Sequence, residues 1–238
     1  MASEKSSLPW NPEVPIKINA HATSANSLAF GLFGFATQVT LIGLLSAGLI
    51  EGSGAAIVFT FFVVTGVLQL IVAGIQLTGR GDLLGNTAMM TFGAYVTSLG
   101  VFNLLAMSGT INPGGPTKDA MTAIFSLYTY VTFVFLIAAL KINVATVINF
   151  AGVMLLFALS AAGSHTGSAA INTASGWVGI FTGISGYYAA TGLFLGEWFQ
   201  YPVLPAGDLS GFWIRRAERA RAGRVQSEAT ILVARESV

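Results

Sequence analysis

Six long stretches of apolar residues dominate the chain, and polar or charged residues gather between them. Each stretch is about 21 to 24 residues long, so a helix built from it reaches roughly 30–36 Å, enough to cross a bilayer. Residues at odd and at even positions are both apolar, which does not fit the alternation of apolar and polar residues in the strands of a membrane β-barrel. The pattern predicts an all-α membrane protein with six transmembrane helices at Leu28–Leu49, Ala56–Leu77, Leu84–Met107, Ala120–Leu140, Ile142–Ala162 and Thr173–Gly196.

Glycines inside these stretches are unusually frequent for helices. The first stretch contains four of them, and each would cost a soluble helix roughly 1 kcal/mol relative to alanine. In a bilayer, small residues allow close helix packing that offsets this cost. We therefore expect the GxxxG pairs Gly179/Gly183 and Gly192/Gly196 to pack helices together, within or between protomers. The alternative is a glycine face that borders a narrow conduit.

Composition and charge place the chain in the membrane and suggest its orientation. Hydrophobic residues make up 54% and charged residues 9% of its 238 residues, against about 25% charged in a soluble domain. We expect a polar tail at 1–27 without a cleavable signal peptide, a membrane domain at 28–200 and a basic tail at 201–238. Ten of the eleven Lys and Arg residues lie in the two tails or in the loops on the same side of the membrane as the tails, and only Lys118 lies on the other side. The positive-inside rule then predicts a plasma (inner) membrane protein with both termini in the cytoplasm. The tail stretch RRAERARAGR would be solvated or would lie on anionic lipid.

Candidate catalytic chemistry is sparse. The chain has no cysteine, and its histidines, His21 and His165, fall in the first tail and in a predicted loop without neighbours at metal-ligand spacing. We expect no metal, no cofactor, no catalytic residue, no enzymatic activity and no nucleic-acid partner. The predicted spans also lack buried charged residues of the kind that proton pumps place at mid-membrane.

Uncharged polar residues remain at membrane depth. They are Gln38, Gln69, Asn86, Asn103 and Asn149. Such groups join helices by hydrogen bonds, or they line a pore, and Gln69 lies nearest the centre of a span. Asn26 lies where the first span begins, so it is an N-cap, part of a pore mouth, or both.

Several motifs resemble one family. The start NSLAFGLFGF (Asn26–Phe35) is similar to the Asn-Pro-Ala-Pro-Leu-Gly-Leu signature of the acetate uptake transporters, the succinate–acetate permease family. The stretch GVLQLIVAGIQLTGRGDLLGNTAMMTFGAY resembles its second and third spans, and LFALSAAG its fifth. The stretches GWVGIFTGISGYYAA and VLPAGD resemble its sixth span and carboxyl end. The motifs occur in the family's order from Asn26 to Asp208.

The resemblance implies a six-helix protomer with its own solute path, assembled as a hexamer in the lipid bilayer. Members move acetate, and some move succinate or other short monocarboxylates. Carried over by motif, a hydrophobic constriction would consist of Phe35, Phe92 and Val153, with Asn26 and Gln69 on the substrate path. The family has tyrosine at Phe92, leucine at Val153, and prolines at Ser27 and Ala29. We therefore expect a wider constriction and a changed substrate range.

The function expected from the sequence is transport of acetate and related acids, with the proton carried by the un-ionised acid. Two alternatives stay open: a pore for small neutral solutes such as ammonia or water, and a membrane sensor that transports nothing.

Overall fold

The computed structural model describes residues 25–213, 215 and 216, and the predicted N-terminal tail and most of the basic C-terminal tail lie outside this part of the chain. Six helices within it are long and apolar enough to span a membrane, and they confirm the six predicted spans to within a few residues. In chain order the elements are α2 (Ser27–Ser46), α3 (Ser53–Thr65), the π-helix η1 (Gly66–Ile71), α4 (Val72–Arg80), α5 (Leu83–Met107), α6 (Gly115–Ala139), α7 (Val144–Thr166) and α8 (Ala169–Phe199).

Four of these helices begin at a polar residue whose side chain caps the first turn. The Asn26 carboxamide oxygen accepts from the Leu28 amide at 3.0 Å, which confirms the predicted N-cap. Asp82, Asn143 and Ser168 cap α5, α7 and α8 in the same way. A cap of this kind satisfies an amide that would otherwise lack a partner at the helix end, worth about 1 kcal/mol.

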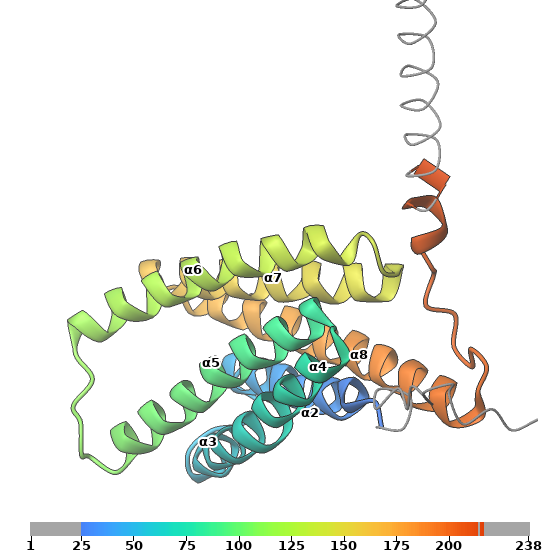
Figure 1. Ribbon diagram of the computed structural model, residues 1–238. Coiled ribbons are helices and arrows are strands. Elements are labelled where there is room, and N and C mark those ends of the chain that lie inside the picture. The colour runs from blue at the N-terminus through green and yellow to red at the C-terminus, as the bar shows by residue number, and fades with distance from the viewer. Residues whose placement is uncertain (1–24, 214, 217–238) are drawn as a thin grey trace, which may run out of the picture.

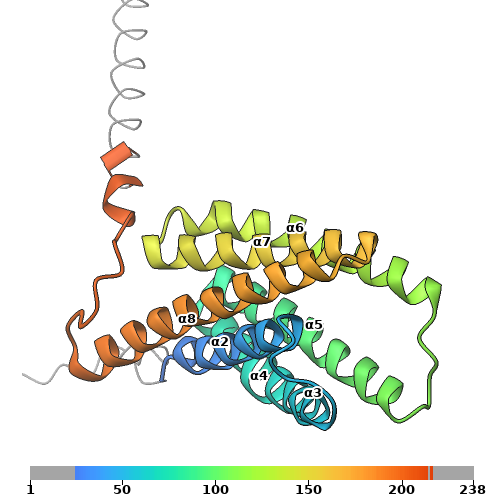
Figure 2. The same cartoon turned by 180° about the vertical axis from the view of Figure 1, so that it is seen from behind.

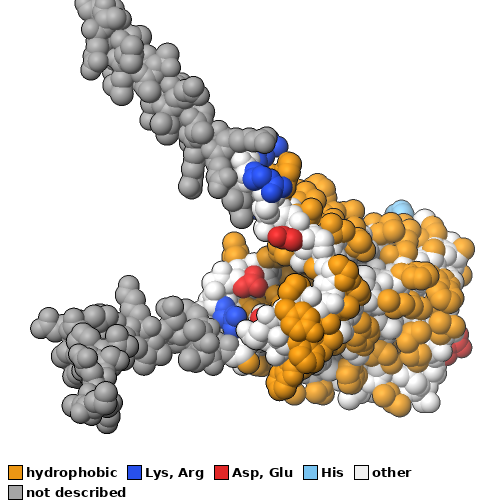
Figure 3. Space-filling view, turned by 90° about the vertical axis from the view of Figure 1, so that its right-hand side faces the viewer, with side chains coloured by type: hydrophobic (Ala, Val, Ile, Leu, Met, Phe, Trp, Pro, Cys, Tyr) orange, Lys and Arg blue, Asp and Glu red, His pale blue; other side chains and the backbone are white. Residues whose placement is uncertain are grey.

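The longest helix, α8, lies along α2 on one side and along α7 on the other, as Figures 1 and 2 show. Helix α6 packs against α7, and a tight turn connects the two helices. Helices α3, η1 and α4 pack against α5. Apolar side chains cover much of the outer surface in Figure 3, as expected where lipid tails replace water. The chain is an integral membrane protein.

Glycines form the seam between α2 and α8. A Cβ built on Gly183 would lie 1.9 Å from the Thr40 hydroxyl oxygen, and one on Gly179 would lie 2.9 Å from the Gly43 Cα. Any larger residue would force the two backbones apart. The predicted packing role of the first GxxxG pair is therefore found within one protomer.

The second span differs from the uninterrupted helix that its apolar run predicts. Between α3 and α4 the chain forms the π-helix η1, in which one extra residue is accommodated per turn. Gly66 is the first residue of this segment and packs against α5, where a Cβ built on it would lie 2.3 Å from the Thr97 hydroxyl oxygen. Gln69, in the same segment, faces Gly34 of α2.

The prediction of a loop around His165 is wrong. Helix α7 continues to Thr166 and α8 starts at Ala169, so His165 belongs to the last turn of α7. Gly167 takes the left-handed conformation that ends α7, with φ of 71°, and Ser168 caps the next helix. The glycine and serine content that indicated a loop instead serves a two-residue turn.

Candidate transport path

Phe35, Phe92 and Val153, here called the apolar ring, come from α2, α5 and α7 and all lie in the hydrophobic core. Their exposed fractions are 4%, 2% and 1%. The ring centroids of Phe35 and Phe92 are 5.1 Å apart. Because all three side chains are buried, the ring is a closed layer in this structure.

A larger cavity of about 600 Å³ lies on one side of this layer. Leu32, Met89 and Phe150 line it, and each precedes one ring residue by three positions on the same helix. Three positions are nearly one helical turn. The floor of the larger cavity therefore lies one turn from the apolar ring on all three helices at once.

A smaller cavity of about 190 Å³ lies on the opposite side. Tyr95 and Leu156 line it, and they follow Phe92 and Val153 by three positions. On α2 the lining begins further along, at Ile42. The apolar ring thus separates two cavities along three helices that run in the same direction.

Further aromatic side chains, which the sequence pattern did not indicate, surround the apolar ring. Phe157 stacks on Phe92 with 6.3 Å between centroids, and Phe135 meets the same ring edge-on at 5.9 Å. Tyr95 lies 5.1 Å from Phe157 and 4.8 Å from Tyr128. Their only sequence signal is spacing, since Phe157 is one turn from Val153, and phenylalanine is common throughout the apolar stretches.

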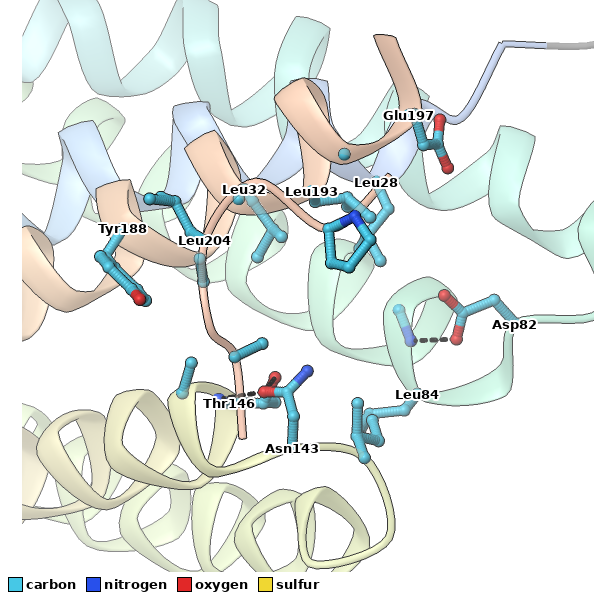
Figure 4. A pocket seen from close by; sticks show the side chains of 18 of the residues that line it. Leu28, Leu32, Asp82, Leu84, Asn143, Thr146, Tyr188, Leu193, Glu197 and Leu204 are labelled. Carbon is cyan, nitrogen blue, oxygen red and sulfur yellow. Dashed lines mark hydrogen bonds between the residues drawn. The ribbon is translucent and has the colours of Figure 1, made fainter. Parts of the chain in front are cut away.

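The two cavities differ in charge. Asp82 and Glu197 line the larger cavity, and no Lys, Arg or His is among its described lining residues. Figure 4 shows these carboxylates near Leu28 and Leu84, with Asn143 and Thr146 on the facing wall. The described lining of the smaller cavity has no ionisable side chain except that of Tyr95. A negative vestibule on one side therefore leads to an uncharged layer.

Gly192 and Gly196, the second GxxxG pair, also line the larger cavity. A Cβ on Gly192 would be 3.5 Å from the nearest atom of Leu204, an ordinary contact. The position of Gly192 and Gly196 therefore agrees with the alternative prediction, a glycine face that borders a cavity, rather than with close packing between helices.

The comparisons with known proteins bear on this arrangement of cavities. The family model described as GPR1/FUN34/yaaH matches residues 9–210, which includes all six membrane helices.

The chain belongs to the GPR1/FUN34/yaaH family.

Some of the similar proteins have transport names, and one is uncharacterized. The succinate-acetate/proton symporter SatP of Escherichia coli K12 is 29% identical over 184 residues, which cover 77% of this chain and 96% of SatP. An uncharacterized protein of Methanothermobacter thermautotrophicus is 29% identical over 188 residues, covering 76% and 91% of the two chains. The solved structure of the bacterial acetate channel SatP superposes with a TM-score of 0.72 at 29% identity, covering 77% of this chain and 99% of that one.

In this member of the GPR1/FUN34/yaaH family, Asn26 connects the start of α2 with the last turns of α8. Its side-chain amide donates a hydrogen bond to the Glu197 carboxylate, while its oxygen caps α2. Leu28 and Glu197, its two contacts, line the larger cavity, but Asn26 is not among the lining residues. It therefore fixes the position of a cavity carboxylate.

Gln69 is placed less directly on the path. It is half-buried against Gly34, whose chain neighbour is Phe35, and it lines neither of the two cavities. Within the described part of the chain its amide makes no hydrogen bond to another residue. Its position beside the apolar ring is compatible with a path that opens there, and its predicted role stays a prediction.

The other polar groups at depth mostly join helices. The Asn149 amide donates to the Thr182 carbonyl at 3.1 Å, and the Asn86 amide donates to the Gly74 carbonyl at 2.8 Å. The buried Gln38 donates to the Thr65 hydroxyl at 2.7 Å. Asn103 is the exception, because it bonds within its own helix and lines the smaller cavity.

Proposed function

We propose that the protein carries acetate and related short carboxylic acids across the membrane, along a path from one cavity to the other through the apolar ring. The observation that carries this proposal is the position of the ring between the two cavities: it lies one helical turn from the larger cavity on three helices and one turn from the smaller cavity on α5 and α7. The acetate transport named for SatP supports the same substrate class.

The transported form is the un-ionised acid. Moving an ionised carboxylate between Phe35, Phe92 and Val153 would strip its water without a compensating donor, at a cost of at least several kcal/mol. The carboxylates of Asp82 and Glu197 in the larger cavity oppose an anion further. The proton then travels on the substrate, and no charged relay inside the protein is required.

Passage requires the closed ring to open. Rotation of Phe35 or Phe92 about its side-chain torsions would connect the cavities without a rearrangement of the helices, and exposed side chains make such flips within nanoseconds. In a packed layer the flips are slower, because neighbouring aromatic rings must move as well. We further propose Gln69 as the group that meets the acid when the ring opens.

Membrane placement completes the proposal. We propose that both termini face the cytoplasm in the plasma (inner) membrane, because Lys118, in the first turn of α6, is the only Lys or Arg at the opposite end of the described helices. We also propose that the protomers associate as hexamers, each with its own path, and that succinate is a further substrate.

The test is uptake of labelled acetate into liposomes that hold the purified protein, compared with protein-free liposomes. We expect acetate uptake to exceed the protein-free rate, while glycerol and ammonia uptake do not. Ammonia or glycerol uptake without acetate uptake would instead favour a pore for neutral solutes. No uptake of any of the three by folded protein would favour a membrane sensor.

A further inference from the structure

The segment that follows α8 is fastened across the end of the helix bundle. Residues 201–213, here called the strap, leave α8 beyond Gln200 and run to the turn between α6 and α7 (Figure 1). Tyr201, Pro202, Leu204 and Ala206 of the strap line the larger cavity. The first half of the strap is therefore a wall of that cavity.

Backbone hydrogen bonds hold the middle of the strap to the start of α7. The Val144 amide donates to the Gly207 carbonyl at 2.8 Å, and the Ala145 amide donates to the Ala206 carbonyl at 3.1 Å. Helix starts carry amides without intrahelical partners, and the strap satisfies two of them here. The Leu209 amide returns a bond to the Ile142 carbonyl at 3.0 Å.

The far end of the strap is held through Trp213. Its indole nitrogen donates to the Leu140 carbonyl at 2.7 Å, at the end of α6. The Lys141 ammonium lies 6.0 Å and the Arg216 guanidinium 5.9 Å from the centre of the Trp213 ring. At these distances a cation and an aromatic face attract one another.

These cations have no acidic partner among the described residues. No described Asp or Glu forms an ion pair with Lys141, Arg215 or Arg216, and the side chains of Arg215 and Arg216 are exposed. The strap's one acidic side chain, Asp208, accepts a hydrogen bond from the Ser210 amide at 2.8 Å. Ser210 holds the pKa of that carboxyl below its usual range through side-chain and backbone hydrogen bonds.

Exposed apolar side chains adjoin the cations. Leu140, Ile142, Val144 and Phe212 are between 40% and 55% exposed. Figure 3 shows Lys and Arg side chains grouped beside apolar surface where the described chain ends. A tryptophan between basic and apolar side chains is typical of the layer where lipid headgroups meet acyl chains.

We propose that Lys141 and Arg216, which lie beside Trp213, and Arg215, the residue before Arg216, bind the phosphate of an anionic phospholipid, and that this lipid clamps the strap over the larger cavity. The occupant is a lipid because the apolar side chains would contact its acyl chains while the cations meet its headgroup. Basic residues beside an anionic leaflet are attracted to its negatively charged headgroups. The inference relies on the proposed cytoplasmic side only for the choice of leaflet.

The test measures thermal unfolding of the purified full-length protein in detergent with added phosphatidylglycerol or phosphatidylcholine. We expect phosphatidylglycerol to raise the melting temperature of the wild type, and phosphatidylcholine to raise it less. The triple variant Lys141→Gln/Arg215→Gln/Arg216→Gln should lose the additional rise, and Lys118→Gln, which removes one positive charge at the other end of the molecule and matches the single variant Arg216→Gln in charge, should keep it. Equal rises in wild type and triple variant would overturn the proposal.

Two further arms keep the result interpretable. Trp213→Phe keeps all three charges but removes the indole donor, so it should unfold at a lower temperature in phosphatidylcholine and keep part of the phosphatidylglycerol effect. Should the triple variant fail to fold, Arg216→Gln alone should reduce the effect. A rise produced by inorganic phosphate alone would mean that the site binds free phosphate rather than lipid. None of these readouts requires transport, so their failure is distinguishable from failure of the proposed function.

Discussion

Val153 is the smallest side chain of the apolar ring, and it is 1% exposed between two cavities. The family pattern inferred from the sequence has leucine there, so this chain lacks one methylene at the layer that the proposed path crosses. A missing methylene in an apolar pocket changes discrimination by about 1–3 kcal/mol. Val153 is therefore the ring position at which size selection is most easily measured.

We expect Val153→Leu to slow uptake of three- and four-carbon acids more than uptake of acetate, by roughly tenfold or more in their ratio. Competition of labelled acetate uptake by a series of unlabelled acids measures this ratio. Val58→Leu is the matched control, because Val58 is also buried but lines neither cavity. An unchanged competition profile in Val153→Leu would remove Val153 from the selective layer.

Gln69 allows a second residue-scale prediction. If its amide meets the acid at the opened ring, Gln69→Leu should reduce acetate uptake strongly while the protein still folds, because leucine keeps most of the volume. Gln76→Leu in the same span is the control, since Gln76 is exposed and away from both cavities. Equal uptake by the two variants would assign Gln69 to packing against Gly34.

At this scale the sequence allowed the ring to be predicted only through family motifs. Periodicity alone could not separate Phe92 from the other phenylalanines of the apolar stretches, because both lipid-facing and core-facing sides of a membrane helix are apolar. Phe157 and Phe135, which contact Phe92, were missed for that reason. Glu197 directly follows the predicted sixth span, and its hydrogen bond with Asn26 could not be predicted because it depends on the packing of α8 along α2.

At the scale of elements, the contact of α2 with α8 depends on backbone approach at glycine. A Cβ on Gly176 would lie 2.3 Å from the Ala47 backbone nitrogen, which no side-chain rotation can relieve. The spacing of Gly179 and Gly183 predicted close helix packing, but it did not identify α2 as the partner helix. The π-helix η1 could not be predicted in the same way, since its extra residue is fixed by contacts such as that of Gly66 with Thr97.

We expect Gly176→Ala to lower the melting temperature by several degrees, because overpacking of this kind costs about 1–3 kcal/mol. Gly79→Ala is the control: nothing lies within 4 Å of a Cβ built there, so its melting temperature should stay the same or rise. Thermal unfolding in one detergent compares both variants with the wild type. Equal melting temperatures for the two variants would mean that the seam can relax.

At the scale of the whole molecule, the charge distribution is the basis for proposing that the un-ionised form of the acid passes. The larger cavity holds Asp82 and Glu197, whereas the apolar ring has no group that could stabilise an anion. The helices that carry these groups were predictable from the sequence as spans. Their arrangement into two cavities with a closed layer between them was not, since it depends on how six apolar helices pack.

Uptake should therefore follow the un-ionised fraction of the acid. With a carboxyl pKa near 4 to 5, that fraction falls about tenfold for each pH unit above it, so uptake at fixed total acetate should rise steeply from about pH 7.5 to about pH 5. The measurement is initial uptake into proteoliposomes with the rate in protein-free liposomes subtracted, because acetic acid also crosses lipid unaided. Glu197→Gln tests the vestibule separately: it should leave this slope unchanged if the apolar ring selects the un-ionised acid, and flatten it if the cavity carboxylate does. A wild-type protein-dependent rate that stays flat across this range would show that the anion itself passes, and would contradict transport of the un-ionised acid.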